Sequence, residues 1–244
     1  PYQRGHRPCS TWSDIIRIVR VFNNIARIAG LEVHRARPLV ENPKPRLTKQ
    51  LLAISAYQYR LLDRIGHVDG DIVECGVGRG KSMLSWCTFI DSSQQVQEQP
   101  NWPVRQIWGF DSFEGLPEPS SDDVNEESDN TVHVQAGTIG DASLNGVTQM
   151  LESFKFSKGL MDNVHLVPGW FEDTLPSFST KIALLHIDVD LHDSYLTVHN
   201  ELYDQVVAGG VIAFDEYKSP WDVERFPGAA KAIDILEKKT VVSI

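Results

Sequence analysis

The stretch Asp71-Ile-Val-Glu-Cys-Gly-Val-Gly-Arg-Gly-Lys-Ser82 decides the fold of this chain. An apolar strand runs into a glycine-rich turn, and a carboxylate, Glu74, lies just before that turn. Glycine lets the backbone turn tightly and approach a ligand closely, and the helix expected from Lys81 directs its free N–H groups into the same space. The stretch therefore predicts a binding loop for a small-molecule cofactor.

The loop departs from both common phosphate-binding patterns. A P-loop that ends in Gly80-Lys-Ser82 requires glycine where this chain has Cys75, and the dinucleotide fingerprint requires a third glycine where it has Lys81. Lys81 therefore disfavours a nicotinamide-dependent oxidoreductase. Glu74 would repel a di- or triphosphate and favours a cationic ligand. Three glycines spaced by two after an acidic residue resemble the first motif of class I methyltransferases, which implies S-adenosylmethionine as the cofactor.

From residue 71 onward, apolar runs of strand length alternate with helical patterns. The alternation predicts an α/β fold, a mostly parallel, twisted, Rossmann-like sheet with helices on both faces. Strands are expected near residues 71–77, 106–110, 163–168, 181–188 and 210–215. Helices are expected near 81–90, 144–155, 193–207 and 228–239, with a further one from about Thr48 to Ile65 and a strand-like run at 240–244.

The first 46 residues differ in charge from the rest of the chain. They carry nine basic and three acidic residues, a balance of +6, whereas the whole chain carries −10 and the remainder therefore −16. Residues 13–29 predict an amphipathic helix with a basic stripe, which can pack on its own domain, on a second subunit or on a membrane surface. We expect a helical extension and a proline-containing linker over 1–46, a catalytic domain over 47–244, and a homo-oligomer formed through the extension.

Composition narrows the class of protein. The 244 residues suit one α/β domain with an appendage. The acidic body argues against nucleic acid as a partner, because phosphate neutralisation supplies much of that affinity. Three cysteines with no CxxC pair favour the reducing cytoplasm. Since no apolar run reaches about 18 residues, we expect no membrane span.

A long acidic segment follows the second predicted strand. Between Asp111 and Asn130 it holds eight acidic residues and no basic one, together with two prolines. Such a segment is either a lid over a cofactor or a solvated surface loop, and the sequence leaves both readings open.

Carboxylates follow the predicted strands, at the edge where an open α/β sheet binds its ligands. Asp111, one strand after the glycine loop, is placed to accept both hydroxyls of a ribose, or else it caps a turn. Asp188, Asp215 and Glu216 end strands that should be neighbours, and a divalent cation would relieve their mutual repulsion. Oxygen-only ligation selects Mg²⁺, Mn²⁺ or Ca²⁺ over zinc. His192 is nearby in the sequence, although a lone histidine is more often structural.

The chain resembles the macrocin O-methyltransferase family of Mg²⁺-dependent sugar methyltransferases that use S-adenosylmethionine. The resemblance rests on six blocks, which occur in order over about two thirds of the chain: Val73-Glu-Cys-Gly-Val-Gly-Arg-Gly80, Phe110-Asp-Ser-Phe-Glu-Gly-Leu-Pro117, Gly169-Trp-Phe-Glu-Asp-Thr-Leu-Pro176, His186-Ile-Asp-Val-Asp-Leu-His-Asp-Ser194, Gly209-Gly-Val-Ile-Ala-Phe-Asp-Glu-Tyr217 and Pro227-Gly-Ala-Ala-Lys-Ala-Ile-Asp234. It implies a class I methyltransferase fold, with the metal at Asp188, Asp215 and Glu216. The residues expected around the cofactor are Glu74, Cys75, Gly76, Val77, Gly80, Ser82, Asp111, Ser112, Trp170, Phe171 and Asp188.

The predicted reaction is methyl transfer from S-adenosylmethionine to a hydroxyl of a small sugar acceptor on a natural product, nucleotide sugar or polysaccharide. We expect Asp188, Asp190 and His192 to be catalytic, with Asp190 as the general base or in a role that supports the metal or caps a helix. A catechol-type phenol methyltransferase and a catalytically silent cofactor-binding module are the alternatives. The family often has aspartate at 216 and tyrosine at 192, and its fold normally closes with a C-terminal hairpin that is not expected here before Ile244.

Overall fold

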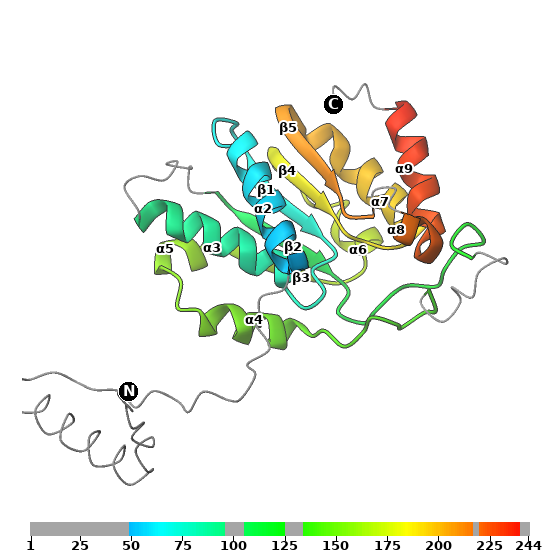
Figure 1. Ribbon diagram of the computed structural model, residues 1–244, viewed down its shortest axis with the longest axis horizontal. Helices are drawn as coiled ribbons and strands as arrows, with labels where there is room; N and C mark the ends of the chain where they lie inside the picture. Colours follow the sequence, from blue (N-terminus) through cyan, green and yellow to red (C-terminus); the bar gives the residue numbers. More distant parts are fainter. Residues whose placement is uncertain (1–48, 96–104, 125–133, 217–219, 240–244) are drawn as a thin grey trace, which may run out of the picture. The chain divides into compact units, whose positions relative to one another are not determined.

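The computed structural model describes residues 49–95, 105–124, 134–216 and 220–239, which lie within the unit Lys49–Ile244 (Figure 1). The predicted helix at 13–29, the linker at 37–46 and the strand-like run at 240–244 lie outside the described residues. The domain boundary at 46/47 and the homo-oligomer stay predictions. Among the helices described, none is both long and apolar enough to cross a membrane.

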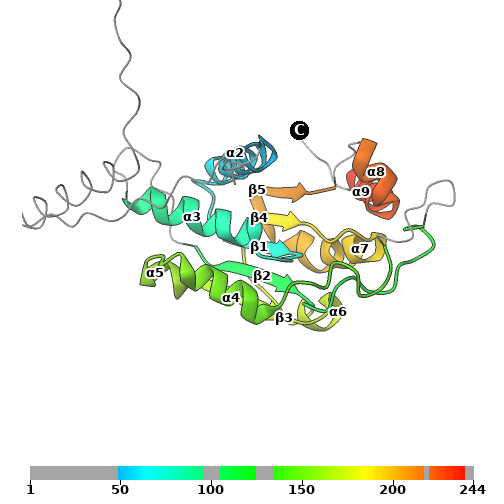
Figure 2. The same cartoon turned by 60° about the horizontal axis from the view of Figure 1, so that its bottom comes forward.

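The predicted parallel sheet is confirmed. Its order is β3-β2-β1-β4-β5 and every pairing is parallel, as Figure 2 shows from the side. The expected position of each strand is correct to within a few residues at its ends. The five strands are β1 (Asp71–Cys75), β2 (Ile107–Asp111), β3 (Val164–Pro168), β4 (Ile182–Ile187) and β5 (Val206–Phe214).

The helices follow the predicted alternation, with two differences. Residues 206 and 207, expected at the end of a helix, instead begin β5, because the helix ends at Leu202 and a short 3-10 turn follows it. Three short helices, α5, α6 and α8, were not predicted, since four to six residues are too few to show a helical period. The helices are α2 (Lys49–Arg64), α3 (Lys81–Gln95), α4 (Leu144–Ser153), α5 (Lys158–Met161), α6 (Phe171–Thr174), α7 (His192–Leu202), α8 (Pro220–Arg225) and α9 (Pro227–Lys239), with the 3-10 turn η1 (Tyr203–Gln205).

Two apolar cores cover the two faces of the sheet, because side chains alternate along each strand. On one face, Ile72 of β1 packs with α2, α3, α4 and α5. On the other face, Val73 and Cys75 pack with α7 and α9. In Figure 1 the first group of helices lies on one side of the sheet, and α7, α8 and α9 lie on the other. Both faces of the sheet are therefore buried, as a parallel sheet requires.

The strand order reverses between β1 and β4, which pair directly although two strands intervene in sequence. In a doubly wound sheet, ligands bind beyond the carboxyl ends of the strands at this switch point. The glycine loop leaves β1 there, and Asp188 leaves β4 beside it. The fold thus places the two most informative stretches of the sequence next to each other.

Candidate active site

The glycine loop is packed against the end of β4. Gly76 has φ +90°, and a Cβ built on it would lie 1.7 Å from the backbone oxygen of Asp188. The Asp188 N–H donates to the Cys75 carbonyl at 2.9 Å, which ties the ends of β1 and β4 together. Gly78 and Gly80 also have positive φ. Only glycine at position 76 allows this close approach of two backbones.

Asp111, at the end of β2, holds the glycine loop. Its Oδ2 accepts the Gly78 N–H at 2.8 Å, and its Oδ1 accepts the Phe113 N–H at 2.7 Å. The adjacent Ser112 hydroxyl donates to the Gly115 carbonyl at 3.1 Å. Asp111 therefore caps a turn, which was one of its two predicted roles. Each of its oxygens also retains a lone pair that a ligand hydroxyl can use.

A buried acid and a buried histidine meet between β1 and β4. Glu74 and His186 are opposite each other in the strand register, and Glu74 Oε1 lies 3.1 Å from His186 Nδ1. Burial raises the pKa of Glu74 and outweighs the opposing contacts with His186 and Ser82. Burial opposes a charge on His186, but the Glu74 contact, with Asp188 and Asp215 beyond it, raises its pKa. Attraction between the carboxylate and the imidazolium lowers the free-energy cost of burying either charged group.

One carboxylate oxygen of Glu74, Oε2, is buried and makes no hydrogen bond within the described part of the chain. Buried carboxylate oxygens normally have a donor, so an unpaired one in native protein calls for an explanation. A ligand with an N–H or O–H group at the end of β1 would supply that donor.

Three carboxylates meet at the ends of β4 and β5. One oxygen from each of Asp188, Asp215 and Glu216 lies within 4.8 Å of the others. Glu216 is buried, Asp188 is partly exposed and Asp215 is exposed, so the group opens to solvent on one side. Burial, and then the charges of Asp215 and Asp190, raise the pKa of Asp188 well above its ordinary value. Burial and the charge of Asp188 do the same to Glu216.

Asp190 lies next to this group in an unusual backbone conformation. Its φ is +62°, in the left-handed region that non-glycine residues seldom occupy. Burial, followed by the charge of Asp215, raises its pKa to about 6. A carboxyl group with this pKa is ready to accept a proton near neutral pH.

Tyr195, which the sequence did not single out, contacts the same group. It is buried on α7, and its hydroxyl donates a hydrogen bond to Glu216 Oε2. The sequence pattern concealed this role, because Tyr195 falls in a helical stripe with Leu191, Val198 and Leu202 that reads as core. Aromatic character fits such a stripe, and nothing in the spacing marks the hydroxyl.

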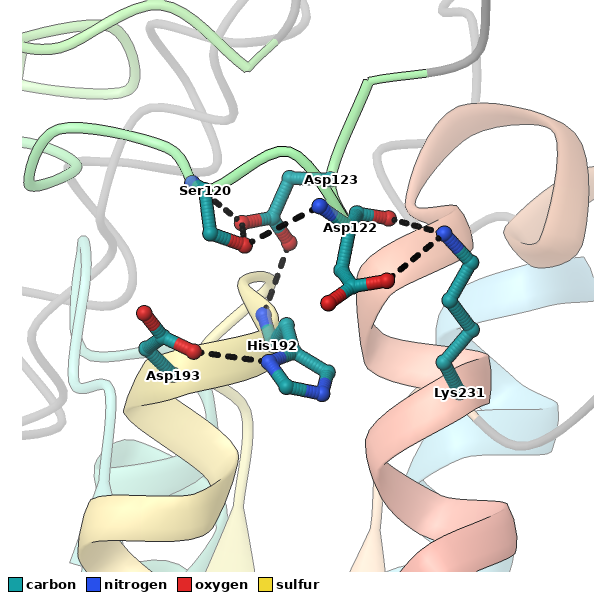
Figure 3. A network of polar contacts seen from close by, with 6 residues as sticks. All are labelled: Ser120, Asp122, Asp123, His192, Asp193 and Lys231. Atoms are coloured by element: carbon teal, nitrogen blue, oxygen red, sulfur yellow. Dashed lines mark hydrogen bonds and ion pairs between the residues drawn. The ribbon is translucent and has the colours of Figure 1, made fainter.

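His192 faces the acidic loop in Figure 3. Its Nδ1 lies 2.7 Å from Asp193 Oδ1, and its backbone N–H donates to Asp123 Oδ1 at 2.7 Å. Its described polar contacts are therefore with the loop and its own helix, and its predicted catalytic role remains a prediction.

The described part of the acidic loop is docked on two helices. Asp123 is buried and also accepts the N–H and the hydroxyl of Ser120, both at 2.8 Å. Lys231 of α9 donates to the Asp122 carbonyl at 2.9 Å and lies 3.1 Å from its carboxylate. A Cβ at Gly228 would lie 1.8 Å from Asp123 Oδ1, so the missing side chain makes room for this carboxylate. Residues 120–123 are thus held in place, whereas residues 125–130 of the predicted segment lie outside the described residues.

The remaining predicted cofactor residues occupy different surroundings. Phe171 begins α6 beyond the carboxyl end of β3, Trp170 directly precedes it, and both are partly exposed. The Cys75 and Val77 side chains are buried in the two cores. Only the backbone atoms of these residues are therefore placed to contact a ligand at the loop. Gly80 is buried beside Val147, and Ser82 lies in the first turn of α3.

Residues 61–236 match the macrocin-O-methyltransferase (TylF) family. The chain belongs to this family. Among its curated relatives, an 8-demethyl-8-(2,3-dimethoxy-alpha-L-rhamnosyl)-tetracenomycin-C 4'-O-methyltransferase of Streptomyces olivaceus is 32% identical over 62% of this chain and 54% of its own length. A mycinamicin III 3''-O-methyltransferase of Micromonospora griseorubida is 29% identical over 63% of this chain and 57% of its own length. The matches thus span little more than half the length of these relatives.

Solved structures of other methyltransferases share the fold. The O-methyltransferase NovP is 24% identical, with a TM-score of 0.62 over 78% of this chain and 73% of its own. The calicheamicin methyltransferase CalS11 is 19% identical, with a TM-score of 0.66 over 97% of this chain and 90% of its own. The protein therefore has the methyltransferase architecture that its sequence predicted.

Proposed function

We propose that the protein transfers a methyl group from S-adenosylmethionine to a hydroxyl of a sugar on a small molecule, with the help of a divalent cation. The observation that carries the proposal is the group Asp188, Asp215 and Glu216, beside a glycine loop at the switch point of the sheet. Membership of the family supports methyl transfer. The tetracenomycin and mycinamicin relatives, named as O-methyltransferases, support an oxygen acceptor, and the rhamnosyl group in one name supports a sugar.

The residues at the end of β1 and β2 suit this cofactor. The unpaired Oε2 of Glu74 offers an acceptor for an ammonium group, and Asp111 retains lone pairs for ribose hydroxyls. The loop carries two exposed basic residues, Arg79 and Lys81, and Arg79 is paired with Asp141. We propose that the loop from Glu74 to Ser82, with Asp111, Ser112, Trp170 and Phe171, surrounds the cofactor.

The donor set suits a hard divalent cation. Three carboxylates whose oxygens lie within 4.8 Å of one another repel each other, and burial amplifies that repulsion. Mg²⁺, Mn²⁺ or Ca²⁺ would relieve it, and among the described residues no nitrogen or sulfur ligand belongs to the group. When bound, such a cation binds and polarises hydroxyl groups and makes them more acidic.

Asp190 is our candidate for the general base. In the transfer, an acceptor oxygen forms a bond to the methyl carbon, the carbon–sulfur bond breaks, and its electron pair stays on sulfur. The hydroxyl proton passes to the Asp190 carboxylate, whose pKa of about 6 leaves it mostly ionised near neutral pH. The strained backbone at this residue supports a functional role, because such strain concentrates at active sites.

The test is a transfer assay with methyl-labelled S-adenosylmethionine, Mg²⁺ and two acceptor panels, one of rhamnosylated aglycones and one of catechols. We expect label on the sugars, at a rate that falls by at least about a hundredfold in Asp190→Asn. Label on catechols alone would replace the sugar acceptor with a phenol. Undiminished transfer in excess EDTA would remove the cation from the mechanism.

A further inference from the structure

We infer that Tyr195 is a positioning residue that fixes the carboxylate of Glu216 for the divalent cation. The inference rests on the proposed function, since it concerns one of the three proposed ligands. It assigns a role to a residue outside the glycine loop and the acidic strand ends.

Tyr195 connects the two strand ends that carry the carboxylates. Its hydroxyl donates to Glu216, the second residue after β5, and also lies 3.1 Å from the carbonyl oxygen of Ile187. Ile187 is the last residue of β4 and directly precedes Asp188. One buried hydroxyl group therefore touches the chain on both sides of the proposed metal site.

Glu216 needs such a partner more than a shorter acid would. Glutamate has one more rotatable bond than aspartate, so holding its carboxylate in one place costs more side-chain entropy. Its neighbours Asp188, Asp190 and Asp215 are all acidic and repel it. A hydrogen bond from Tyr195 to Oε2 opposes both effects and holds the carboxylate in one orientation.

The position of Tyr195 is itself fixed by the core. The side chain is fully buried, and its ring packs against Phe214 of β5 with the ring centres 6.0 Å apart. Packing alone would be served by phenylalanine, and the Ile187 carbonyl alone would satisfy a buried hydroxyl. The added contact with Glu216 is what links this residue to the ligand set. Groups that orient metal ligands in this way contribute roughly 10–100-fold to metal affinity.

The test measures Mn²⁺ binding to the full chain, by calorimetry and by the electron paramagnetic resonance signal of the free ion. Tyr195→Phe keeps the ring and removes the hydroxyl, so we expect Mn²⁺ affinity to fall by roughly 10–100-fold. Tyr203→Phe is the matched control: Tyr203 stacks on His199 at the far end of α7, and the ring contact survives the change. Its Mn²⁺ affinity should equal that of the wild type.

The outcomes separate this inference from the proposed function. If the wild type binds Mn²⁺ and Tyr195→Phe binds it within twofold, the inference is wrong while the metal site stands. If the wild type binds no Mn²⁺, the metal site and the inference fail together. Thermal melting is measured for each variant, and if Tyr195→Phe does not fold, Tyr195→Met replaces it, because methionine also fills an apolar site without a hydroxyl group. Weaker Mn²⁺ binding by the folded variant is expected, and unchanged or tighter binding overturns the inference.

Discussion

Replacement of Gly76 by alanine tests the packing that brings the two halves of the site together. The new Cβ would lie 1.7 Å from the Asp188 backbone oxygen, and real Cβ contacts are essentially never below 3.0 Å. The ends of β1 and β4 would have to move apart, against the 2.9 Å hydrogen bond from Asp188 to Cys75. The φ of +90° adds backbone strain. Strain of about 1–3 kcal/mol and overpacking of about 1–3 kcal/mol together predict a loss of about 2–6 kcal/mol in the free energy of unfolding.

Gly78→Ala is the control for this prediction. Gly78 also has positive φ, at +49°, but a Cβ there would meet nothing within 4 Å. Only the left-handed conformation is then penalised, which costs about 1–2 kcal/mol. Urea unfolding of both variants, followed by circular dichroism, gives the two free energies directly. Equal losses in Gly76→Ala and Gly78→Ala would refute the argument that the strand ends are in backbone contact.

Three further predictions concern buried groups. His186→Leu leaves Glu74 buried without its partner, so the free energy of unfolding, measured in urea titrations, should fall by roughly 3–5 kcal/mol. The double variant His186→Leu/Glu74→Gln should recover part of this loss. Asp123→Ala removes the acceptor for the first N–H of α7, a loss of about 0.5–2 kcal/mol by the same assay; a change below that range would mean that the loop does not hold the helix. Burial raises the pKa of Cys87 to about 12 and also raises that of Cys75. At pH 8 roughly one Cys87 thiol in 10,000 is then ionised, so both cysteines should resist iodoacetamide. Mass spectrometry should find them alkylated only after unfolding.

The sheet was predictable because its strands are short, largely apolar runs that alternate with helical patterns. The glycine loop indicated where β1 ends, and the alternation of strands and helices indicated that the strands pair in parallel. The start of β5 was not predictable in the same way. Val206 and Val207 continue the apolar pattern of the preceding helix, and only the intervening 3-10 turn separates them from it.

Much of the candidate site also followed from the sequence. Asp188 and Glu216 follow strands that were expected to be neighbours, and parallel neighbours end at the same edge of a sheet. Tyr195 and Asp123 could not be found by this reasoning. One lies in an apolar helical stripe, and the other lies in a run of acidic residues that looks uniformly solvated until the fold brings it to α7.

A calorimetric titration of the purified chain with S-adenosylmethionine, with NAD⁺ and ATP as controls, first in Mg²⁺ and then in EDTA, tests the cofactor assignment. We expect saturable binding of S-adenosylmethionine alone, because the loop from β1 presents the carboxylate of Glu74 and lacks both phosphate-binding patterns. Binding of NAD⁺ or ATP in its place would contradict the interpretation of the glycine loop. No binding of any of the three would contradict the assignment of a cofactor site to this end of the sheet.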